Sequence, residues 1–487
     1  MAILYHSTND HNEKTRFREA LLNGMASNYG LYMMPRKYIP KMSKSHIRAM
    51  ETESYAQIAF RVLYPYITPD IKEKDFKEIL EDTYDEDVIP VDLQKVTGDT
   101  FILWLSKGPT YSFKDFAARF FGRVLNYFLD ENGLKRTVIV ATSGDTGGAV
   151  ADALYGLSNV SNIVFFPANA ISESQRRQMT TLWKNIYAFS VNGDFDVCQD
   201  IAKNLLGDNN FAAECFGDRE MFTSANSISL GRLLPQAVYP FFAYSRMNLN
   251  GKECIASVPS GNFGDMMGTV IAKEMGLPIK KIVCGVNENR EYPDFLYTGK
   301  YRVKASIWSP SSAMIVSHPS NLARLIEFYG GHIYDERDDR TKRVKNSGII
   351  KKMPDMEEMR EDIYSVSINN EQHYSTIRNV YDTFGVVLDP HGAVGWKALE
   401  DYMNGRPTEP AVVYETADPG KFPDDITKAI GIVPETPEGI QRQSSKKERV
   451  YTIENGPNID KTGSNRMSEE QYVEVKEKLR GLFEGPS

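Results

Sequence analysis

The stretch Cys254-Ile255-Ala256-Ser257-Val258-Pro259-Ser260-Gly261-Asn262-Phe263-Gly264-Asp265 decides the fold class. It is an apolar run that ends at a proline, followed by a turn flanked by glycines and then by a helical apolar pattern. We therefore predict a buried strand, a turn and a helix. Glycines let a ligand approach the backbone closely, and a helix N-terminus favours an anion. The turn 260–264 is a candidate phosphate site, although an ordinary strand-to-helix turn has the same pattern.

The same strand–loop–helix pattern recurs along the chain. Further apolar runs that predict buried strands are 137–141, 162–166, 281–285 and 411–414. Loops containing Gly, Ser or Asn follow them, usually with a helix behind, which predicts an α/β fold with a mostly parallel sheet wrapped by helices. Ligands bind in the loops after the strands of such sheets. The first ~90 residues are predicted to be mainly helical, because the apolar residues of 56–63 have helical spacing.

The composition is that of an ordinary globular protein with no nucleic-acid or membrane partner. Its 487 residues exceed what one hydrophobic core supports, which predicts two or three domains. The net charge of −8 provides no basic surface, and no apolar run is long enough to span a bilayer. The four cysteines form no Cys-x-x-Cys pair and the seven histidines no metal-binding pattern, so we predict no metal site. No secretory signal is visible, and we expect a cytoplasmic enzyme.

Three other segments are interpreted as structural. The charged stretch 336–352 and the polar stretch 434–448 are predicted to be surface loops, and 468–483 is predicted to be a closing helix. His391 is the one histidine in a strongly patterned turn, Asp389-Pro390-His391-Gly392. We interpret it as a structural residue, or as a neighbour of a site, rather than as a catalytic base.

Lys114 is the strongest candidate for chemistry. A loop with Gly108 and Pro109 leads into an amphipathic helix, and the lysine stands near the start of that helix. A desolvated lysine beside positive charge loses its proton and becomes a nucleophile toward a carbonyl carbon. Pyridoxal phosphate is such a carbonyl compound, and it also carries a phosphate. Lys114 and the turn 260–264 together therefore predict pyridoxal phosphate as the cofactor.

Two further loops carry clustered polar side chains. The loop 141–147 places three hydroxyls and the Asp145 carboxylate around glycines, which suits a substrate carboxylate or phosphate. A helix cap needs only one of these groups, so the surplus favours a binding function. The segment 223–232 ends in Arg232, whose guanidinium can bind phosphate through two hydrogen bonds. For this segment alone, a helix cap with a surface arginine is the preferred interpretation. Thr416, after the last strand, could face a pyridine nitrogen, although a lone threonine is a negligible signal.

Taken together, these segments resemble the threonine synthase family of pyridoxal-phosphate enzymes of fold type II. The matching segments, in chain order, are 10–13, 108–116, 142–147, 172–179, 193–199, 226–228, 258–265, 319–321 and 389–394. The resemblance implies two open, mostly parallel sheets wrapped by helices. It also implies a mainly helical N-terminal domain (1–95), a large cofactor-binding α/β domain (96–125 and 240–487) and a smaller mobile α/β domain (126–239).

The resemblance also implies an activity, a carbon–oxygen lyase that converts O-phospho-L-homoserine and water into L-threonine and phosphate by γ-elimination and β-addition. A monomer or homodimer that binds a small amino-acid substrate is expected. The implied residue roles are as follows: catalysis by Lys114 and Thr146; cofactor binding by Lys114, Asp145, Ser260, Gly261, Asn262, Phe263, Gly264 and Thr416; substrate binding by Ser143, Thr146, Asn226, Ser227 and Arg232.

The chain departs from the family pattern at positions near these motifs. Lys107 replaces a histidine, Ser229 an asparagine, Arg290 an acid and Asp418 a histidine, and Trp104 also stands in place of an acid. The alternative is therefore a related lyase or γ-replacement enzyme that acts on another O-phospho or O-acyl amino acid. A catalytically silent scaffold is a third hypothesis, which nothing in the sequence favours because Lys114 and the turn 260–264 are both intact.

Overall fold

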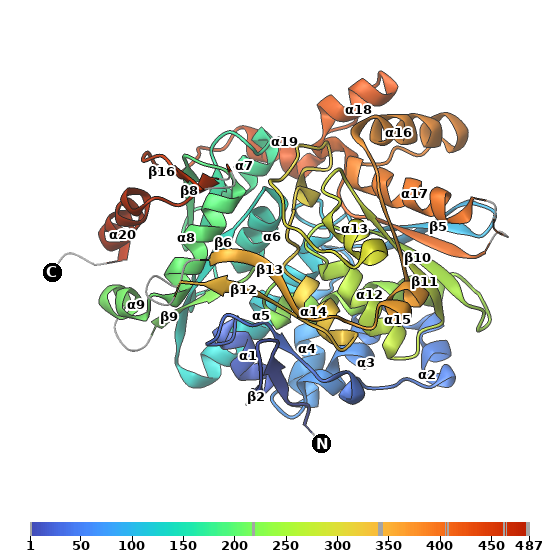
Figure 1. Cartoon of the computed structure of the whole chain (residues 1–487), viewed down its shortest axis with the longest axis horizontal. Coiled ribbons are helices and arrows are strands. Elements are labelled where there is room, and N and C mark those ends of the chain that lie inside the picture. Colours follow the sequence, from blue (N-terminus) through green and yellow to red (C-terminus); the bar gives the residue numbers. More distant parts are fainter. Residues whose placement is uncertain are drawn as a thin grey trace.

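The computed structural model of the chain contains two main sheets that lie side by side, each surrounded by helices (Figure 1). The structure describes residues 2–216, 220–338, 344–404, 406, 409–460, 463 and 465–483. Within these ranges the larger sheet has six strands in the order β14-β11-β10-β15-β5-β4. The smaller sheet has five, in the order β16-β8-β7-β6-β9. The predicted α/β class with two mostly parallel sheets is confirmed.

The larger sheet is parallel except for its edge strand β4, which runs antiparallel to β5. Its strands are β4 (Asp92–Thr97), β5 (Thr100–Trp104), β10 (Cys254–Pro259), β11 (Ile279–Val286), β14 (Ile363–Ser367) and β15 (Ala411–Glu415). The helices of this part of the chain are α12 (Gly264–Glu274), α13 (Glu291–Thr298), α14 (Leu322–Phe328), α15 (Met356–Asp362), α16 (Asn370–Phe384), α17 (Pro390–Met403) and α18 (Pro423–Ile430).

Alternating side chains of β10 explain why helices cover both faces of this sheet. Ala256 and Val258 belong to the same apolar cluster as the helix α12. Ile255 points to the other face and belongs to the cluster built on α17. Because successive side chains of a strand point to opposite faces, a strand buried on both sides reads as a continuous apolar run. The sequence of β10 has that form.

The smaller sheet is parallel throughout the described residues. Its strands are β6 (Lys135–Ala141), β7 (Val160–Pro167), β8 (Ile186–Val191), β9 (Glu220–Ser224) and β16 (Tyr451–Ile453). The helices in this part of the chain are α5 (Lys114–Asn132), α6 (Asp145–Leu154), α7 (Glu173–Thr180), α8 (Phe195–Gly207), α9 (Asn209–Phe216), α10 (Leu230–Leu233) and α11 (Val238–Arg246), and α19 (Glu438–Ser444) and α20 (Glu469–Phe483) join them from the C-terminal part.

The C-terminal segment belongs to the smaller sheet. The family resemblance implies that 240–487 belongs to the larger domain, whereas β16 pairs with β8 and the ring of Tyr451 stacks on Phe189 at 5.1 Å. Helix α20 then lies beside α9 at one end of the molecule (Figure 1), where Arg480 forms an ion pair with Glu214 at 2.6 Å. A strand of three residues has too little pattern to be recognised in the sequence. The remaining domain boundaries stay predictions.

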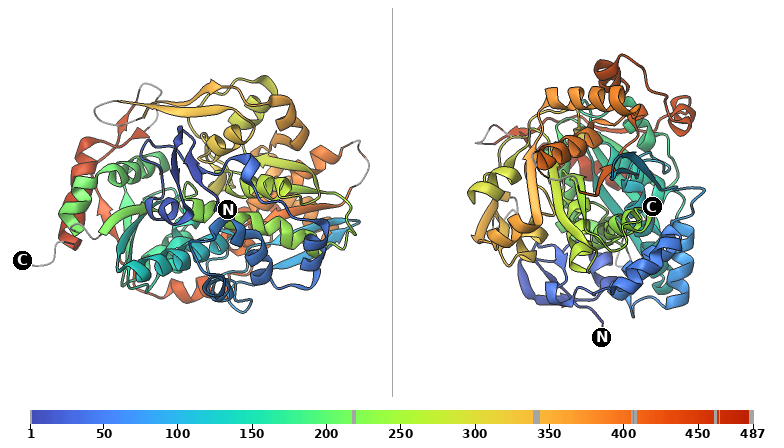
Figure 2. Two further views of the ribbon diagram at one scale, coloured as in Figure 1. Left: turned by 90° about the horizontal axis from the view of Figure 1, so that it is seen from below. Right: turned by 90° about the vertical axis from the view of Figure 1, so that its right-hand side faces the viewer.

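The N-terminal region lies along the bottom of the molecule in Figure 1 and in the right-hand view of Figure 2. Its helices are α1 (Phe17–Asn23), α2 (Lys44–Ala49), α3 (Tyr55–Ile67) and α4 (Glu73–Thr83), so the helical prediction is confirmed. A small antiparallel sheet of β1 (Tyr5–Ser7), β2 (Asp10–Thr15) and β3 (Tyr32–Met33) was not predicted. These strands are short, and β2 is too polar to show an apolar alternation.

Two predicted loops contain regular structure. β13 (Val344–Lys352) lies within the stretch 336–352 predicted to be a charged loop, of which 339–343 lies outside the described residues. It pairs antiparallel with β12 (His332–Arg337), whose last two residues reach into that stretch. Helix α19 lies within the polar stretch 434–448. Both elements expose charged or polar side chains, so they lack the apolar signal on which the sequence analysis depends. The closing helix is confirmed as α20. No helix in the described ranges has the length and apolar character needed to cross a membrane.

Arg324 joins three parts of the chain beneath the loops that follow the strands. Its side chain is fully buried. Its Nε donates to the Tyr32 carbonyl at 2.9 Å, and its terminal nitrogens donate to the carbonyls of Ser227 and Ile228 at 3.2 and 2.6 Å. It also donates to the Asn321 side chain at 2.6 Å. Burial lowers the pKa of Arg324 to about 9, so the guanidinium stays charged at neutral pH.

Arg324→Met should lower the free energy of unfolding by about 3 kcal/mol or more, because three backbone carbonyls lose a charged donor. Urea unfolding followed by circular dichroism measures the change. Arg442→Met is the matched control, since Arg442 is 69% exposed and pairs with its helix neighbour Glu438. It should shift stability by less than about 0.5 kcal/mol. Equal stability of the two variants would contradict the structural role given to Arg324.

Candidate active site

One pocket opens between the carboxyl ends of the two sheets, and it has about 850 Å³ of empty space including its mouth. Its wall contains most of the residues singled out in the sequence: Lys114, Ser143, Asp145, Thr146, Asn226, Ser227, Arg232, Gly261, Asn262, Gly264 and Thr416. Ser260 and Phe263 lie behind the wall. The Ser260 hydroxyl donates to the Val258 carbonyl at 3.1 Å, and the Phe263 ring packs edge-on against Tyr292. These two residues shape the turn through the backbone.

Lys114 is the first residue of α5, and its side chain is 16% exposed. The loop that precedes it is held by the segment after β15. Phe113 donates its backbone N–H to the Thr416 carbonyl at 2.9 Å, and Asp418 donates to Tyr111 at 3.1 Å. Burial lowers the pKa of the Lys114 amine, and the neighbouring Asp145 only partly opposes this effect. The predicted desolvated lysine at a helix start is therefore present.

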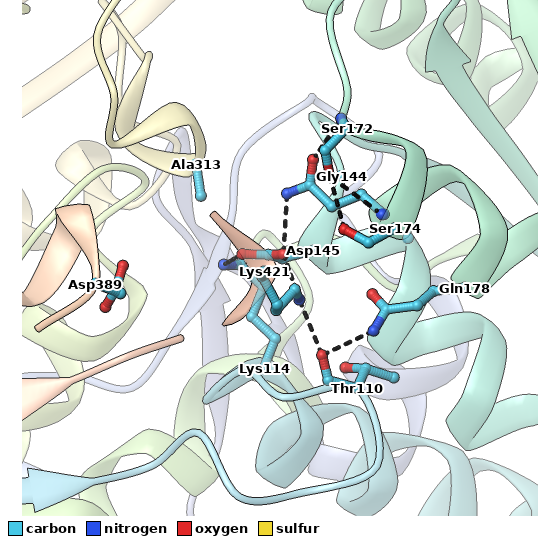
Figure 3. Close-up of polar contacts among 12 residues, drawn as sticks. Thr110, Lys114, Gly144, Asp145, Ser172, Ser174, Gln178, Ala313, Asp389 and Lys421 are labelled. Atoms are coloured by element: carbon cyan, nitrogen blue, oxygen red, sulfur yellow. Dashed lines mark hydrogen bonds and ion pairs between the residues drawn. The ribbon is translucent and has the colours of Figure 1, made fainter. Parts of the chain in front are cut away.

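Asp145 lies opposite Lys114, at the first position of α6 (Figure 3). Its Oδ1 accepts hydrogen bonds from Lys421 Nζ at 2.7 Å and from Gln175 Nε2 at 3.1 Å. Its Oδ2 lies 3.6 Å from Lys114 Nζ. Burial alone would raise the pKa of Asp145, but the nearby Lys421 and Lys114 outweigh it and hold that pKa well below its usual range. The pocket thus contains a buried carboxylate that stays ionised.

The turn between β10 and α12 has room for a ligand but not for side chains. A Cβ on Gly261 would lie 2.9 Å from the Ala313 carbonyl oxygen, and one on Gly264 would lie 2.6 Å from Gln236 Nε2. Phe263 has φ 60°, in the left-handed region, which aims successive N–H groups of the turn. The side chain of Asn262 is fixed by the Ser320 hydroxyl at 3.2 Å. A tight turn at the N-terminus of a helix of eleven residues fits a phosphate.

The pocket therefore fits pyridoxal phosphate. A buried amine with a lowered pKa, a cradle for an anion and an ionised carboxylate all line one cavity. The Asp145 Oδ2 atom is buried and has no hydrogen-bond partner in the described chain. Buried polar atoms are normally paired, so this atom indicates a position where a polar ligand belongs. Thr416 lies in the wall with 5% of its surface exposed and can meet a ring of such a ligand.

Two of the predicted substrate-binding residues, Asn226 and Arg232, differ in how many of their polar atoms already have hydrogen-bond partners within the protein. Asn226 is occupied, because its amide donates to the Ala141 carbonyl at 2.7 Å and accepts from the Ala141 N–H at 3.2 Å. Arg232 donates one hydrogen bond to the Ala225 carbonyl at 2.7 Å, while its buried Nε has no partner among the described residues. Burial lowers the pKa of Arg232 to about 10, so it remains a cation at neutral pH. Arg232 is thus available for an anionic ligand.

The departures from the family pattern lie outside the described pocket wall. Lys107 is 44% exposed and pairs with Asp92, and Arg290 is 61% exposed and pairs with Asp294. Asp418 accepts the Gly420 N–H at 2.8 Å and caps a short helical turn. Ser229 precedes α10 as a buried capping residue, and Trp104 donates to Gln94 at the sheet edge. These substitutions therefore do not change the residues that line the described pocket.

Several residues of the site were not assigned from the sequence. Lys421 follows β15 and donates to Asp145. Asp265 lines the pocket, and burial raises its pKa to about 6. His391 also lines the pocket and accepts the Ala313 N–H at 3.1 Å. Each lies within a few residues of the carboxyl end of a strand or at the start of a helix, and that position is the only sequence signal that could have identified them.

The comparisons with known proteins agree with this geometry. Residues 4–84 match the family described as threonine synthase N terminus, 94–414 match pyridoxal-phosphate dependent enzyme, and 392–462 match threonine synthase, C-terminal. Threonine synthase of Pseudomonas aeruginosa is 34% identical over 459 residues, covering 93% of this chain and 96% of that protein. The chain belongs to the threonine synthase family. The Saccharomyces cerevisiae enzyme is 32% identical, with 93% of this chain and 95% of that protein covered.

Solved threonine synthase structures share the whole fold. The structure of the PLP-bound enzyme from Brucella melitensis has a TM-score of 0.85 and 29% identity, and covers 99% of this chain and all of that one. The Escherichia coli enzyme gives 0.83 and 27%, with the same coverage. The chain is a pyridoxal-phosphate-dependent lyase of fold type II, as the sequence analysis expected. The roles of the individual site residues stay predictions.

Gly261→Ala should weaken pyridoxal phosphate binding by about tenfold or more while the fold persists, because the added methyl would strike backbone atoms of Ala313 and Met314. Equilibrium titration of the visible absorbance measures the affinity. Gly481→Ala is the control, since a Cβ there meets nothing within 4 Å and lies on α20. Unchanged affinity in Gly261→Ala would show that the turn does not hold the cofactor phosphate.

Proposed function

We propose that this pocket converts O-phospho-L-homoserine and water into L-threonine and phosphate by γ-elimination and β-addition. Membership of the threonine synthase family supports this activity. The observation that carries it is the arrangement of Lys114 and Arg232, a buried amine with a lowered pKa and an incompletely paired guanidinium in one cavity. The alternative, a related lyase or γ-replacement enzyme for another O-phospho or O-acyl amino acid, loses its motivation because the substituted positions lie away from the wall.

The residues around the turn and the lysine would hold the cofactor. The backbone N–H groups of residues 261–264 would bind its phosphate, and Lys114 would bind it covalently. Ser260 and Phe263 would keep the turn in shape. Asp145 would lie near the oxygen substituent of the ring, and the Thr416 hydroxyl near the ring nitrogen. When bound, the cofactor supplies an electron sink for the negative charge that develops on the substrate.

Lys114 and the polar wall would divide the remaining tasks. Lys114 would remove the proton from the substrate Cα and move protons at Cβ, since a buried amine with a lowered pKa can act as a base near neutral pH. The Thr146 hydroxyl, on the second residue of α6, would take part in these steps. Ser143, Ser227 and Asn226 would hold the substrate, with Asn226 acting partly by fixing Ala141. Arg232 would stabilise the charge on the departing phosphate.

The cellular setting is also part of the proposal. All four cysteines are buried free thiols, which suits a reducing compartment such as the cytoplasm. The net charge of −8 is unfavourable for binding a nucleic acid. We infer an enzyme that acts on a small amino-acid substrate as a monomer or homodimer. The smaller sheet would move against the larger one to close the pocket and exclude water during the reaction.

The purified protein with bound pyridoxal phosphate should release phosphate and threonine in equal amounts from O-phospho-L-homoserine. Phosphate without threonine would instead indicate a lyase that forms a keto acid. Lys114→Ala should fold, lose the visible absorbance of the lysine-bound cofactor and lower kcat by roughly 10²–10⁴-fold, because the base is gone. Lys107→Ala, on the exposed lysine of the same loop, should keep both properties. An unchanged spectrum in Lys114→Ala would reject the assignment.

Arg232→Met should raise KM for O-phospho-L-homoserine by roughly 10- to 100-fold, because charge-assisted hydrogen bonds to the substrate phosphate are lost. Its pyridoxal phosphate affinity should change by less than about twofold, which separates substrate from cofactor binding. Steady-state kinetics and a cofactor titration measure the two quantities. Arg290→Met serves as the control because Arg290 is exposed and pairs with Asp294. If Arg232→Met lost cofactor and substrate affinity equally, Arg232 would belong to the cofactor site.

A further inference from the structure

Lys421 is a fully buried lysine that contacts Asp145 from behind the described pocket wall. It ends the helical turn Pro419–Lys421, five residues after Thr416 and six after Glu415, the last residue of β15. Its Nζ donates to Asp145 Oδ1 at 2.7 Å and to the Thr110 carbonyl at 2.9 Å. Figure 3 shows the side chains of Lys421, Lys114 and Asp145 converging. A loop of the larger sheet is thereby joined to the first turn of a helix of the smaller one.

The surrounding backbone fixes the position of this lysine. Gln178 Nε2 donates to the same Thr110 carbonyl at 3.0 Å, so that oxygen has two donors. Residues 416–418 pair with 111–113, which holds the Lys421 turn and the Lys114 loop at one spacing. Asp418 caps the turn through the Gly420 N–H. Burying a lysine is costly unless its charge is compensated. The number of contacts that hold Lys421 in place therefore indicates that its buried charge has a specific function.

The two lysines share one carboxylate unequally. The contact of Asp145 with Lys421 is a short hydrogen bond of 2.7 Å, whereas Lys114 Nζ lies 3.6 Å from the other oxygen. Lys421 therefore supplies the charged hydrogen-bond donor that stabilises the buried Asp145 carboxylate. Lys114 is not required as the main partner of the ion pair, and the nearby positive charge also disfavours its ammonium form.

We propose that Lys421 is a positioning residue: it occupies the Asp145 carboxylate and so leaves the Lys114 amine free for bonding to the cofactor and for proton transfer. This inference rests on the proposed function. The charged groups that act on Lys114 are Asp145 and Asp265, which favour its ammonium form, and Lys421 and Arg232, which oppose it. Removal of Lys421 changes this balance in two ways, because a repelling charge disappears and Asp145 is released to pair with Lys114.

The test is the rate at which Lys114 bonds to pyridoxal phosphate. The full chain is freed of cofactor with hydroxylamine, pyridoxal phosphate is added, and the visible absorbance is followed as the amine adds to the aldehyde carbon and one water is released. At pH 7 the second-order rate constant of Lys421→Met should be about tenfold lower than that of the wild type, which corresponds to one unit of pKa. The pH at which the rate levels off should rise accordingly. Lys421→Arg, which keeps the charge, should stay within about threefold of the wild type.

Lys107→Met is the matched control, since it removes an exposed lysine from the loop that precedes Lys114. Its rate constant should equal that of the wild type. A purely structural defect would lower the fraction of active protein, and hence the amplitude, without moving the pH dependence. A rate constant of Lys421→Met equal to or above the wild-type value would overturn the proposal. If the wild type itself formed no lysine-bound cofactor, the proposed function would fail, and this inference with it.

A second pair of variants covers the case in which Lys421→Met does not fold because Asp145 is left as a buried unpaired charge. Asp145→Asn removes that charge, and the double variant Asp145→Asn/Lys421→Met leaves neither ion. The rate constants of these two variants should differ by less than about threefold, because the role proposed for Lys421 runs through the Asp145 carboxylate, which both variants lack. A loss of tenfold or more in the double variant relative to Asp145→Asn would show that Lys421 acts independently of Asp145 and would contradict the proposal.

Discussion

The buried carboxylate of Asp145 is the group on which the active site depends. It lies at the start of α6, beside the smaller sheet, while Lys421 follows β15 of the larger sheet and Lys114 begins α5. Removing charges from water is costly, so these three side chains are compatible with folding only when they meet. The same requirement brings the two sheets to a defined distance and gives Lys114 its altered acid–base behaviour. The cluster of Asp145, Lys421 and Lys114 therefore both links the two sheets and sets the acid–base behaviour of Lys114.

Much of the fold was predictable because its signals are local. The apolar runs that form β6, β7, β10, β11 and β15 are buried on both faces, and burial of that kind leaves a continuous pattern in a single segment. β16 was missed because the strand it pairs with, β8, lies far away in the chain, and a three-residue strand carries no pattern that records this partner. The β12–β13 hairpin was mistaken for a loop because its two strands are rich in charged and polar side chains.

The residues of the candidate site likewise fall into those that could be predicted from the sequence and those that could not. Lys114, Asp145 and the turn 260–264 were found because each combines a reactive or flexible residue type with a predicted helix start. Lys421 was not, because its meaning depends on a partner 276 residues earlier in the chain. The occupied amide of Asn226 was equally hidden, since only the fold shows that it faces the backbone of Ala141. Sequence indicates which groups can react, and tertiary structure decides which of them are free to do so.

The pairing of β16 with β8 has a consequence for how the protein is made. The first four strands of the smaller sheet leave the ribosome early, but the strand that covers the edge of β8 begins only at residue 451. Four of the six strands of the larger sheet must be synthesised in between, with that edge uncovered in the nascent chain. Uncovered strand edges are where chains pair with one another and aggregate. Newly made molecules are thus open to such pairing until residues 451–453 have been synthesised and have added to the edge of β8.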